Sequence, residues 1–227
     1  MVTPEHKRAF KDDLFEQFAR IGGALANGHR IELLDVLAQA ERSVEELATE
    51  TALSVANASQ HLQVLRRAGL VETRREGTRI CYRLAGPDVF ALWQAMRATG
   101  EARLAEIDRV VSDYLSDRAD MEEVAPDELQ RRLEAGEVTL IDVRPLIESG
   151  SGRIAGALQI PINELTARIA ELPTGLPVVA YCRGPYCVYA DEAVQILTER
   201  GFRAVRLTSG YPDWRAEGRP TETGVPV

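Results

Sequence analysis

One stretch of the sequence is the most informative about the fold: Val178-Val179-Ala180-Tyr181-Cys182-Arg183-Gly184-Pro185-Tyr186-Cys187-Val188. An apolar strand pattern runs directly into Cys182, and a short loop then leads into a helical pattern. At the carboxyl end of a parallel strand, a side chain meets bound ligands. A thiol there also faces a helix amino terminus and loop amides, which stabilise a thiolate. The pattern therefore predicts a nucleophilic Cys182, and the alternative is a buried structural cysteine.

The sequence on both sides of this stretch alternates between apolar β-runs and helical patterns. The β-runs are residues 138–143, 177–181 and 204–207, and the helical patterns are residues 126–135, 163–171 and 188–200. This alternation predicts an α/β domain with a parallel sheet and covering helices. A mostly polar segment precedes it, so we expect a domain at 126–227, a linker at 118–125 and a first domain at 1–117.

The first domain begins with helical patterns. Apolar residues at spacings of three and four predict a first helix (Phe10, Leu14, Phe18, Ile21 and Leu25), which Gly22, Gly23, Asn27 and Gly28 are expected to end. Ile31, Leu34 and Leu37 mark a second helix. Ser43 and Glu46 form a capping-box pattern at the start of a third. Ser54 caps a fourth helix, whose predicted apolar face is Val55, Ala58, Leu62 and Leu65.

Two β-like runs follow the fourth helix, at residues 70–74 and 79–84. Gly69 closes the helix, and the turn between the runs contains Gly77, where a hairpin needs a positive φ. Two short helices followed by a hairpin predict a winged helix-turn-helix in a mostly helical α+β domain. A long helical stripe from Val89 to Leu115 is too apolar for a small domain to bury alone, so we expect a homodimer.

The fourth helix, from Ser54 to Arg66, suits the major groove of DNA. Amides and hydroxyls on its outward side can pair with base edges, and arginines of the hairpin can hold phosphates. The predicted DNA-binding residues are Ser54, Asn57, Ser59, Gln60, His61, Gln63, Arg67, Arg74, Arg75 and Arg79. Residues 54–84 hold six arginines and two glutamates, a local balance of +4, although the whole chain carries a formal charge of −8. The alternative is a helical domain with a polar surface.

Composition limits the remaining classes of function. No apolar run reaches the roughly 18–20 residues of a membrane span, so we expect no membrane partner. The charged amino terminus is unlike a secretory signal, and three cysteines cannot all be paired. These observations predict a cytoplasmic protein without a disulfide framework.

The first half of the chain resembles the ArsR family of winged-helix repressors. The resemblance covers about residues 10–115 and lies in Leu53-Ser54, Ser59, His61-Leu62, Leu65, Ala68-Gly69-Leu70-Val71, Arg74-Arg75-Glu76-Gly77 and Tyr82-Arg83-Leu84. It implies a homodimer that binds a palindromic operator and leaves DNA when an inducer is sensed. The region that carries a metal-binding cysteine pair in arsenic sensors is Ser43-Val44-Glu45-Glu46-Leu47 here, and the last helix has no histidine. We therefore expect no metal and no cofactor.

The second half resembles rhodanese domains over about residues 124–220. The matching residues are Ile141-Asp142-Val143-Arg144, Glu148, Gly152-Arg153-Ile154-Ala155-Gly156-Ala157, Ile160-Pro161, Tyr181-Cys182-Arg183, Gly201-Phe202, Leu207, Gly210 and Trp214. The resemblance implies sulfur transfer, in which Cys182 accepts a sulfane sulfur as a persulfide. The six residues from Cys182 to Cys187 suit sulfur, because the related phosphatases and arsenate reductases have a loop one residue longer.

The loop departs from the rhodanese pattern at its end. Cys187 stands where the family has Arg or Lys, Gly152-Arg153 where it has Gly-His, and Ser149 where it has an aromatic residue. Losing the loop-end cation weakens binding of thiosulfate, for which Arg183, Arg144 and Arg153 are the candidate replacements. The predicted site is Cys182, Arg183 and Cys187, with the loop residues Gly184, Pro185, Tyr186 and Val188 and the supporting residues Asp142, Arg144 and Arg153.

The other cysteines each leave two interpretations. Cys187 either resolves a persulfide on Cys182 or packs under the loop; we favour the resolving role, since redox-sensing thiols usually have a neighbouring partner. Cys81 is either a small apolar residue of the wing or an accessory redox thiol.

Three functions follow from these patterns. The first is a transcription regulator, a repressor in our expectation, that senses persulfide, polysulfide or thiosulfate through Cys182. The second is a sulfurtransferase whose winged-helix half mainly dimerises. The third is a Cys182–Cys187 thiol–disulfide switch for general oxidants.

Overall fold

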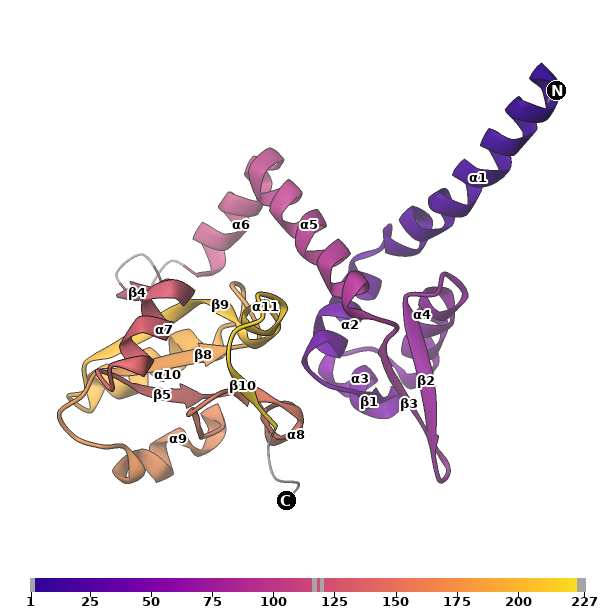
Figure 1. Cartoon of the computed structure of the whole chain (residues 1–227). Helices are drawn as coiled ribbons and strands as arrows, with labels where there is room; N and C mark the ends of the chain where they lie inside the picture. The colour runs from indigo at the N-terminus through magenta and orange to yellow at the C-terminus, as the bar shows by residue number, and fades with distance from the viewer. Residues whose placement is uncertain (1–2, 116–117, 119–120, 224–227) are drawn as a thin grey trace. The chain divides into compact units, whose positions relative to one another are not determined.

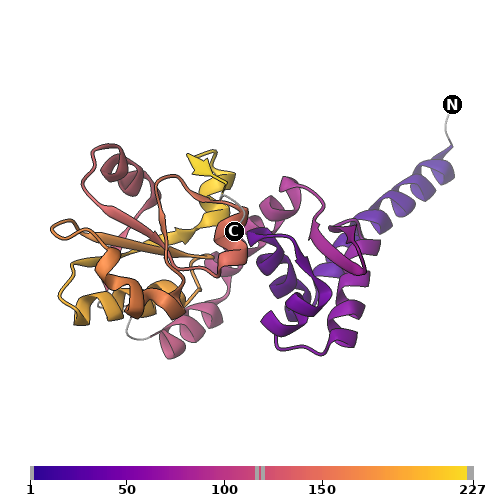
Figure 2. The same ribbon diagram turned by 90° about the horizontal axis from the view of Figure 1, so that it is seen from below.

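The computed structural model describes residues 3–115, 118 and 121–223. The chain divides into two compact units, residues 1–97 and 98–227. Figures 1 and 2 show the helices and strands of each unit. Among the described residues, no helix is both long and apolar enough to span a membrane.

Within the described residues, the first unit contains four complete helices, a small antiparallel sheet and the first part of a helix that begins at Pro87. The helices are α1 (Pro4–Leu25), α2 (Gly28–Gln39), α3 (Val44–Glu50) and α4 (Val55–Arg67), and the strands are β1 (Arg42–Ser43), β2 (Val71–Glu76) and β3 (Arg79–Leu84), in the order β1-β3-β2. Leu33, Leu47, Leu62 and Leu65 are fully buried in the core between the helices. The expected winged helix-turn-helix is therefore present, with β2 and β3 as its wing.

Local signals in the sequence set these boundaries. Ser43 and Glu46 form both bonds of the predicted capping box at the start of α3. The side chain of Ser54 accepts a hydrogen bond from the amide of Asn57 at the start of α4. Gly69 and Gly77 have φ values of 76° and 61°, as expected for a helix end and a tight hairpin turn.

Two expectations about this unit are wrong. Gly22 and Gly23 lie inside α1, which continues to Leu25, because isolated glycines lower helix stability without forcing a break. The break comes at Asn27, whose side chain caps α2 instead. Val55 was expected on the apolar face of α4, but it is 47% exposed, because this first residue of the helix lies beyond the edge of the core.

The long apolar stripe forms two helices rather than one, α5 (Pro87–Arg103) and α6 (Ala105–Tyr114). Leu104 between them has an extended backbone. A Cβ added to Gly100 would lie 3.0 Å from the end of the Ile107 side chain. The glycine therefore lets α6 fold back closely against the last turns of α5, and this local contact ends the helix.

The second unit is built on a parallel sheet of five strands. The order is β4 (Glu123–Val124), β9 (Ala204–Gly210), β8 (Val178–Cys182), β5 (Thr139–Asp142) and β7 (Leu158–Gln159), and every neighbouring pair is parallel. A separate pair, β6 (Arg153–Ile154) and β10 (Thr221–Glu222), is antiparallel. The expected α/β fold with a parallel sheet is confirmed.

Helices cover both faces of this sheet (Figure 2). They are α7 (Pro126–Glu134), α8 (Leu146–Ser151), α9 (Ile162–Arg168), α10 (Tyr189–Glu199) and α11 (Tyr211–Ala216), with a 3₁₀ turn at Ile169–Glu171. Side chains of β8 alternate between two cores: Val178, Ala180 and Cys182 pack with α9 and α10, while Val179 and Tyr181 pack with α7 and α11. This alternation places the Cys182 side chain on the α10 side.

Candidate functional site

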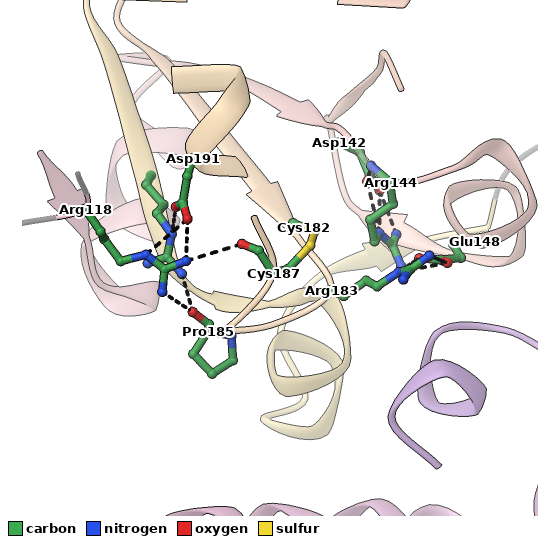
Figure 3. The surroundings of a disulfide bond; sticks show 10 residues. Arg118, Asp142, Arg144, Glu148, Cys182, Arg183, Pro185, Cys187 and Asp191 are labelled. Carbon is green, nitrogen blue, oxygen red and sulfur yellow. Dashed lines mark hydrogen bonds and ion pairs between the residues drawn. A yellow bond between two sulfur atoms is a disulfide. The ribbon is translucent and has the colours of Figure 1, made fainter. Parts of the chain in front are cut away.

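Cys182 is the last residue of β8, a central strand of the sheet, and its side chain is 1% exposed. It is joined to Cys187 by a disulfide, with the two Cα atoms 6.2 Å apart (Figure 3). The loop between the cysteines leads directly to α10, which begins at Tyr189. The sulfur atoms therefore lie where the strand ends and a helix amino terminus begins, the position at which a thiolate is stabilised.

Gly210 positions this loop from the neighbouring strand. It pairs with Cys182 at the end of β9. A Cβ at this position would come within 2.1 Å of the Arg183 carbonyl oxygen. Any larger residue would thus push the loop away from the sheet. The sequence showed Gly210 only as part of the closing rhodanese motif, because this close approach joins segments nearly 30 residues apart.

Asp142, the last residue of β5, and Arg144 form a buried ion pair. Both side chains are 0% exposed, and Arg144 Nη2 lies 2.6 Å from Asp142 Oδ2. Arg144 also donates to the Gly152 carbonyl at 2.7 Å, and the Tyr181 hydroxyl donates to Asp142 Oδ2 at 2.6 Å. Burial, followed by the nearby Asp142 carboxylate, raises the pKa of Tyr181 well above its usual value. These groups stay in place as a structural network.

Arg183 points toward Glu148 rather than across the loop (Figure 3). Its Nη2 lies 2.6 Å from Glu148 Oε1, and the Glu148 side chain is 0% exposed. Arg153 pairs in the same way with Glu222 at 2.7 Å. The three arginines considered as replacements for the loop-end cation are therefore each neutralised by a carboxylate. Sequence reasoning noted Glu148 in the motif but did not identify it as the partner of Arg183.

Two further arginines contact the outer side of the loop. Arg118 and Arg206 both donate to the carbonyl of Pro185, and both pair with Asp191 of α10 (Figure 3). Sequence reasoning missed both. An arginine inside the apolar run of β9 was a usable signal for Arg206, since a charge in a buried strand needs a partner. Arg118 lies in the expected linker, where the sequence offers no signal.

The predicted base-reading residues of α4 differ in their exposure. Ser54 and Gln60 are exposed, and Asn57, Ser59, His61 and Gln63 are half-buried. The Gln63 side-chain amide donates a hydrogen bond to the hydroxyl of Tyr82 in the wing at 3.4 Å. This bond links α4 to β3.

His61 of α4 lies beside His29, with the ring centres 5.6 Å apart. Burial, then the charges of Arg30 and His29, lower its pKa.

The arginines of the wing are exposed, but several are paired within the unit. Arg74 forms ion pairs with Glu41 and Glu76, and Arg83 pairs with Glu72. Arg75 donates to the Gly77 carbonyl at 3.1 Å. The side chains of Arg67 and Arg79 form no ion pair within the described part of the chain. The positive charge available to a partner is therefore smaller than the arginine count indicates.

Cys81 lies in β3 and is 8% exposed. Burial, followed by the charge of Glu41, raises the pKa of its thiol, which favours the interpretation as a small packed residue over a reactive thiol. In the described residues, no cluster of three or more His, Cys, Asp or Glu side chains has a geometry that could hold a metal ion.

Comparisons with known proteins agree with this architecture. A model of the bacterial regulatory proteins of the arsR family matches residues 27–73, and a model of the rhodanese-like domain matches residues 125–217. The HTH-type transcriptional regulator Rv0324 of Mycobacterium tuberculosis is 48% identical over 217 residues, which cover 96% of this chain and 95% of that protein.

Other relatives match one half only. A sulfurtransferase of Allochromatium vinosum is 34% identical over 92 residues, 40% of this chain and 84% of that protein. The solved homodimeric winged helix-turn-helix domain of a possible ArsR-family regulator from Mycobacterium bovis is 50% identical, with a TM-score of 0.40, and covers 41% of this chain and 87% of that one. From the match to Rv0324 over nearly the whole of both chains, together with the two family models, the protein belongs to the ArsR family of DNA-binding transcription regulators and carries a rhodanese-like domain in its second half.

Proposed function

We propose that this regulator is a repressor whose affinity for operator DNA changes when reactive sulfur reacts at Cys182. The observation that carries the proposal is the Cys182–Cys187 pair itself, which closes into a disulfide across a loop that lacks the usual cation. A thiol with a second thiol within bonding reach suits a sensor, because the second thiol converts a transient modification into a lasting covalent state.

The chemistry requires two steps. The Cys182 thiolate first attacks the sulfane sulfur of a persulfide or polysulfide, which breaks that sulfur–sulfur bond, releases the donor as a thiolate and leaves Cys182 as a persulfide. The Cys187 thiolate then attacks Sγ of Cys182, and the outer sulfur leaves as hydrosulfide. The two cysteine thiols are oxidised to a disulfide, and one sulfane sulfur is reduced to hydrosulfide.

The charges around the loop favour uncharged or singly charged donors. Thiosulfate is a dianion, and its binding needs a cation at the loop. Arg144, Arg153 and Arg183 are each paired with a carboxylate, and Cys187 replaces the loop-end cation. We therefore propose persulfide or polysulfide as the sulfur donor ahead of thiosulfate.

Exposed apolar side chains support a homodimer. On α1, Phe10, Phe15 and Phe18 are 63%, 64% and 60% exposed, and Leu14 is 38% exposed. Exposed aromatic groups in one row favour association, since their burial releases roughly 25 cal/mol per Å². A second copy supplies the same surface in a two-fold dimer, which would place two α4 helices on a palindromic operator. We propose residues 1–117 and 126–227 as the domains, with a linker at 118–125 whose last part, β4, pairs with β9 of the sheet.

The test is DNA binding by the full chain to the region upstream of its own gene. We expect polysulfide treatment of the reduced protein to change the Kd by roughly 5- to 150-fold, the usual range of allosteric coupling. Cys182→Ser should bind DNA and ignore polysulfide, and Cys187→Ser should stop at the persulfide. Cys81→Ser is the matched control and should respond like the wild type. An unchanged Kd in the treated wild type would overturn the proposal.

A second candidate function is sulfur transfer by the rhodanese-like half. The position of Cys182 at a strand end and the similarity to the Allochromatium vinosum protein named a sulfurtransferase favour it. Turnover of thiosulfate with cyanide, and no retention on promoter DNA at physiological salt, would support this function over regulation.

The third candidate, a switch for general oxidants, is distinguished from sulfur sensing by the mass of the protein after treatment. Each added sulfur raises the mass by about 32 Da, whereas a plain disulfide lowers it by about 2 Da. Under sulfur sensing, Cys187→Ser gains sulfur from polysulfide and gains none from peroxide. A disulfide formed equally fast in the wild type with peroxide would favour the general switch.

A further inference from the structure

The loop between the two cysteines is held on its outer side by two guanidinium groups. Arg118 Nη1 donates to the Pro185 carbonyl at 2.5 Å, and Arg118 Nη2 donates to the Cys187 carbonyl at 3.4 Å. Arg206 Nη2 donates to the same Pro185 carbonyl at 2.7 Å. Two of the carbonyls of this six-residue loop are thus directed away from the sulfur atoms and toward cations (Figure 3).

Asp191 anchors both arginines to α10. Arg118 Nε donates to Asp191 Oδ2 at 3.2 Å, and Arg206 Nε lies 2.7 Å from Asp191 Oδ1. The Arg118 and Arg206 side chains are 13% and 3% exposed, so solvent screens them little. Burial, followed by the charge of Arg118, lowers the pKa of Arg206, which shares the buried Asp191 with Arg118 and also pairs with Glu123 at 2.8 Å.

These contacts orient the loop amides. In a trans peptide the N–H of the following residue points opposite to the carbonyl. Drawing the Pro185 and Cys187 carbonyls toward the arginines therefore turns the amides of Tyr186 and Val188 to the other side of the loop. A group of loop amides directed to one side stabilises an anion there. In the reduced protein, amides turned in this way would favour the thiolate of Cys182 through the backbone, since the loop-end position itself holds Cys187.

Arg118 and Arg206 differ in where they come from. Arg206 belongs to β9 of the sheet, whereas Arg118 lies in the expected linker, before the rhodanese-like domain that begins near residue 125. Within the same unit, the Tyr186 hydroxyl donates to Glu101 of α5, so the loop has a second contact with the chain that precedes the domain.

We propose that Arg118 is a positioning residue that fastens the linker to the 182–187 loop, so that the acidity of Cys182 and the conformation of the linker depend on each other. Arg118 contacts the side chain of Asp191 in α10, and it contacts the backbone carbonyls of Pro185 and Cys187 in the loop. Only the contacts with these carbonyls depend on the conformation of the loop backbone. Opening the disulfide moves the two sulfurs from a bond of about 2 Å to a contact of about 3.5–4 Å, which shifts Cys187 and its carbonyl. This deepens the proposed function, on which it rests for its regulatory meaning, by naming a linker residue that contacts the loop directly, beside Arg206, which also pairs with Glu123 of the linker.

The first test measures the acidity of Cys182 in the reduced full chain. In a Cys187→Ser background, alkylation of Cys182 is followed by mass spectrometry as a function of pH. Arg118→Gln should raise the pKa of Cys182 and slow alkylation at pH 7 by about three- to tenfold, since tenfold corresponds to one pKa unit. Arg118→Lys keeps the positive charge but loses the several N–H donors of the guanidinium group. Its Cys182 pKa should therefore lie between those of the parent and Arg118→Gln.

Arg203→Gln is the matched control. Arg203 pairs with Glu122, which also lies in the expected linker, but that pair is exposed and Arg203 has no contact with the loop. Its alkylation profile should equal that of the parent. Superimposable profiles for Arg118→Gln and the parent would overturn the proposal. Should Arg118→Gln fail to fold, Arg118→Lys decides, and a parental profile there overturns it.

The second test measures the linker. Amide hydrogen exchange of the peptide that contains Arg118 should be slower in the disulfide form than in the reduced form, and Arg118→Gln should abolish this difference. Equal exchange in the two forms of the wild type would contradict the coupling. Neither test contains DNA, so a regulator whose DNA affinity ignores polysulfide would sink the proposed function and leave this inference intact.

Discussion

In the 1–97 unit, Arg74 and Arg83 of the wing lie on the surface, with side chains 56% and 59% exposed, and their glutamate partners come from the same hairpin or a neighbouring loop. In the rhodanese-like unit, Arg144 is 0% exposed and Arg183 is 13% exposed, and each has a fully buried carboxylate partner. Both units thus contain paired arginines, which are exposed to solvent in the wing and largely buried in the rhodanese-like unit.

The difference bears on what each region can do. A surface ion pair contributes about 0–1 kcal/mol, so a wing arginine can exchange its glutamate for a DNA phosphate at little cost. A buried pair cannot open without leaving an uncompensated charge, which costs several kcal/mol. The wing is therefore suited to an exchangeable polyanion, whereas Arg144 and Arg183 are suited to holding one conformation.

The largest expected effect contrasts the two kinds of pair directly. Arg144→Met should destabilise the rhodanese-like unit by about 3–5 kcal/mol, because it leaves Asp142 buried without its cation. Arg83→Gln, in the wing, should change stability by less than about 1 kcal/mol. Urea titrations followed by hydrogen exchange of β8 and β3 peptides measure each unit separately. Similar losses for the two variants would break the comparison.

The next effect concerns base reading by α4. Gln60→Ala should weaken binding to operator DNA by about 1–3 kcal/mol, which is roughly 5- to 150-fold. Gln63→Ala should reduce discrimination between bases less than Gln60→Ala does, because the Gln63 amide already donates to the Tyr82 hydroxyl. Fluorescence anisotropy with the operator and a scrambled duplex measures both. An equal loss of affinity for the two duplexes in Gln60→Ala would assign Gln60 to the backbone rather than to a base.

A smaller effect is expected for phosphate contacts of the wing. Arg79→Ala should lower the dependence of log Kd on log salt by about one unit, since one phosphate contact is lost. Arg74→Ala should change the slope somewhat less, because Arg74 must first give up its surface ion pair with Glu41, at a cost of about 0–1 kcal/mol. The Kd is measured over a salt series with operator DNA. Equal changes of slope in the two variants would show that ion pairs within the wing do not limit the contacts of its arginines with DNA phosphates.

The smallest effect is a pH dependence in the 1–97 unit. The pKa of His61 is lowered in the folded state, so the unfolded state binds more protons around the ordinary histidine pKa of about 6.5. Stability should therefore fall as the pH decreases from 7.5 toward 5.5, and His61→Gln should remove part of this fall. Thermal unfolding at several pH values measures it, and identical pH slopes in the two proteins would contradict it.

Much of the fold was predictable because it depends on local patterns. The capping box at Ser43, the hairpin at Gly77 and the strand that ends at Cys182 are each set by a few neighbouring residues. The errors fell where the packing of particular side chains decides. The stripe after Val89 has helical periodicity throughout, but Ile107 packing over Gly100 divides it into two helices.

The candidate site was predictable only in part. The position of Cys182 follows from a strand pattern, and the short spacing between Cys182 and Cys187 makes Cys187 a candidate partner thiol. The partners of the arginines do not, because Arg183 and Glu148 are separated by 35 residues and Arg118 and Asp191 by 73. No local pattern distinguishes an arginine that faces the loop from one that a buried carboxylate has drawn away.

The sequence by itself therefore determined the order of most elements and the place of the thiol at the end of a strand, since these follow from periodicity, capping and turn chemistry. Only the tertiary structure decided how charge is distributed around that thiol. A carboxylate selects its arginine by proximity in three dimensions, and burial makes that selection nearly irreversible. The same physics leaves Arg118, a linker residue without a sequence signal, on the outer side of the loop.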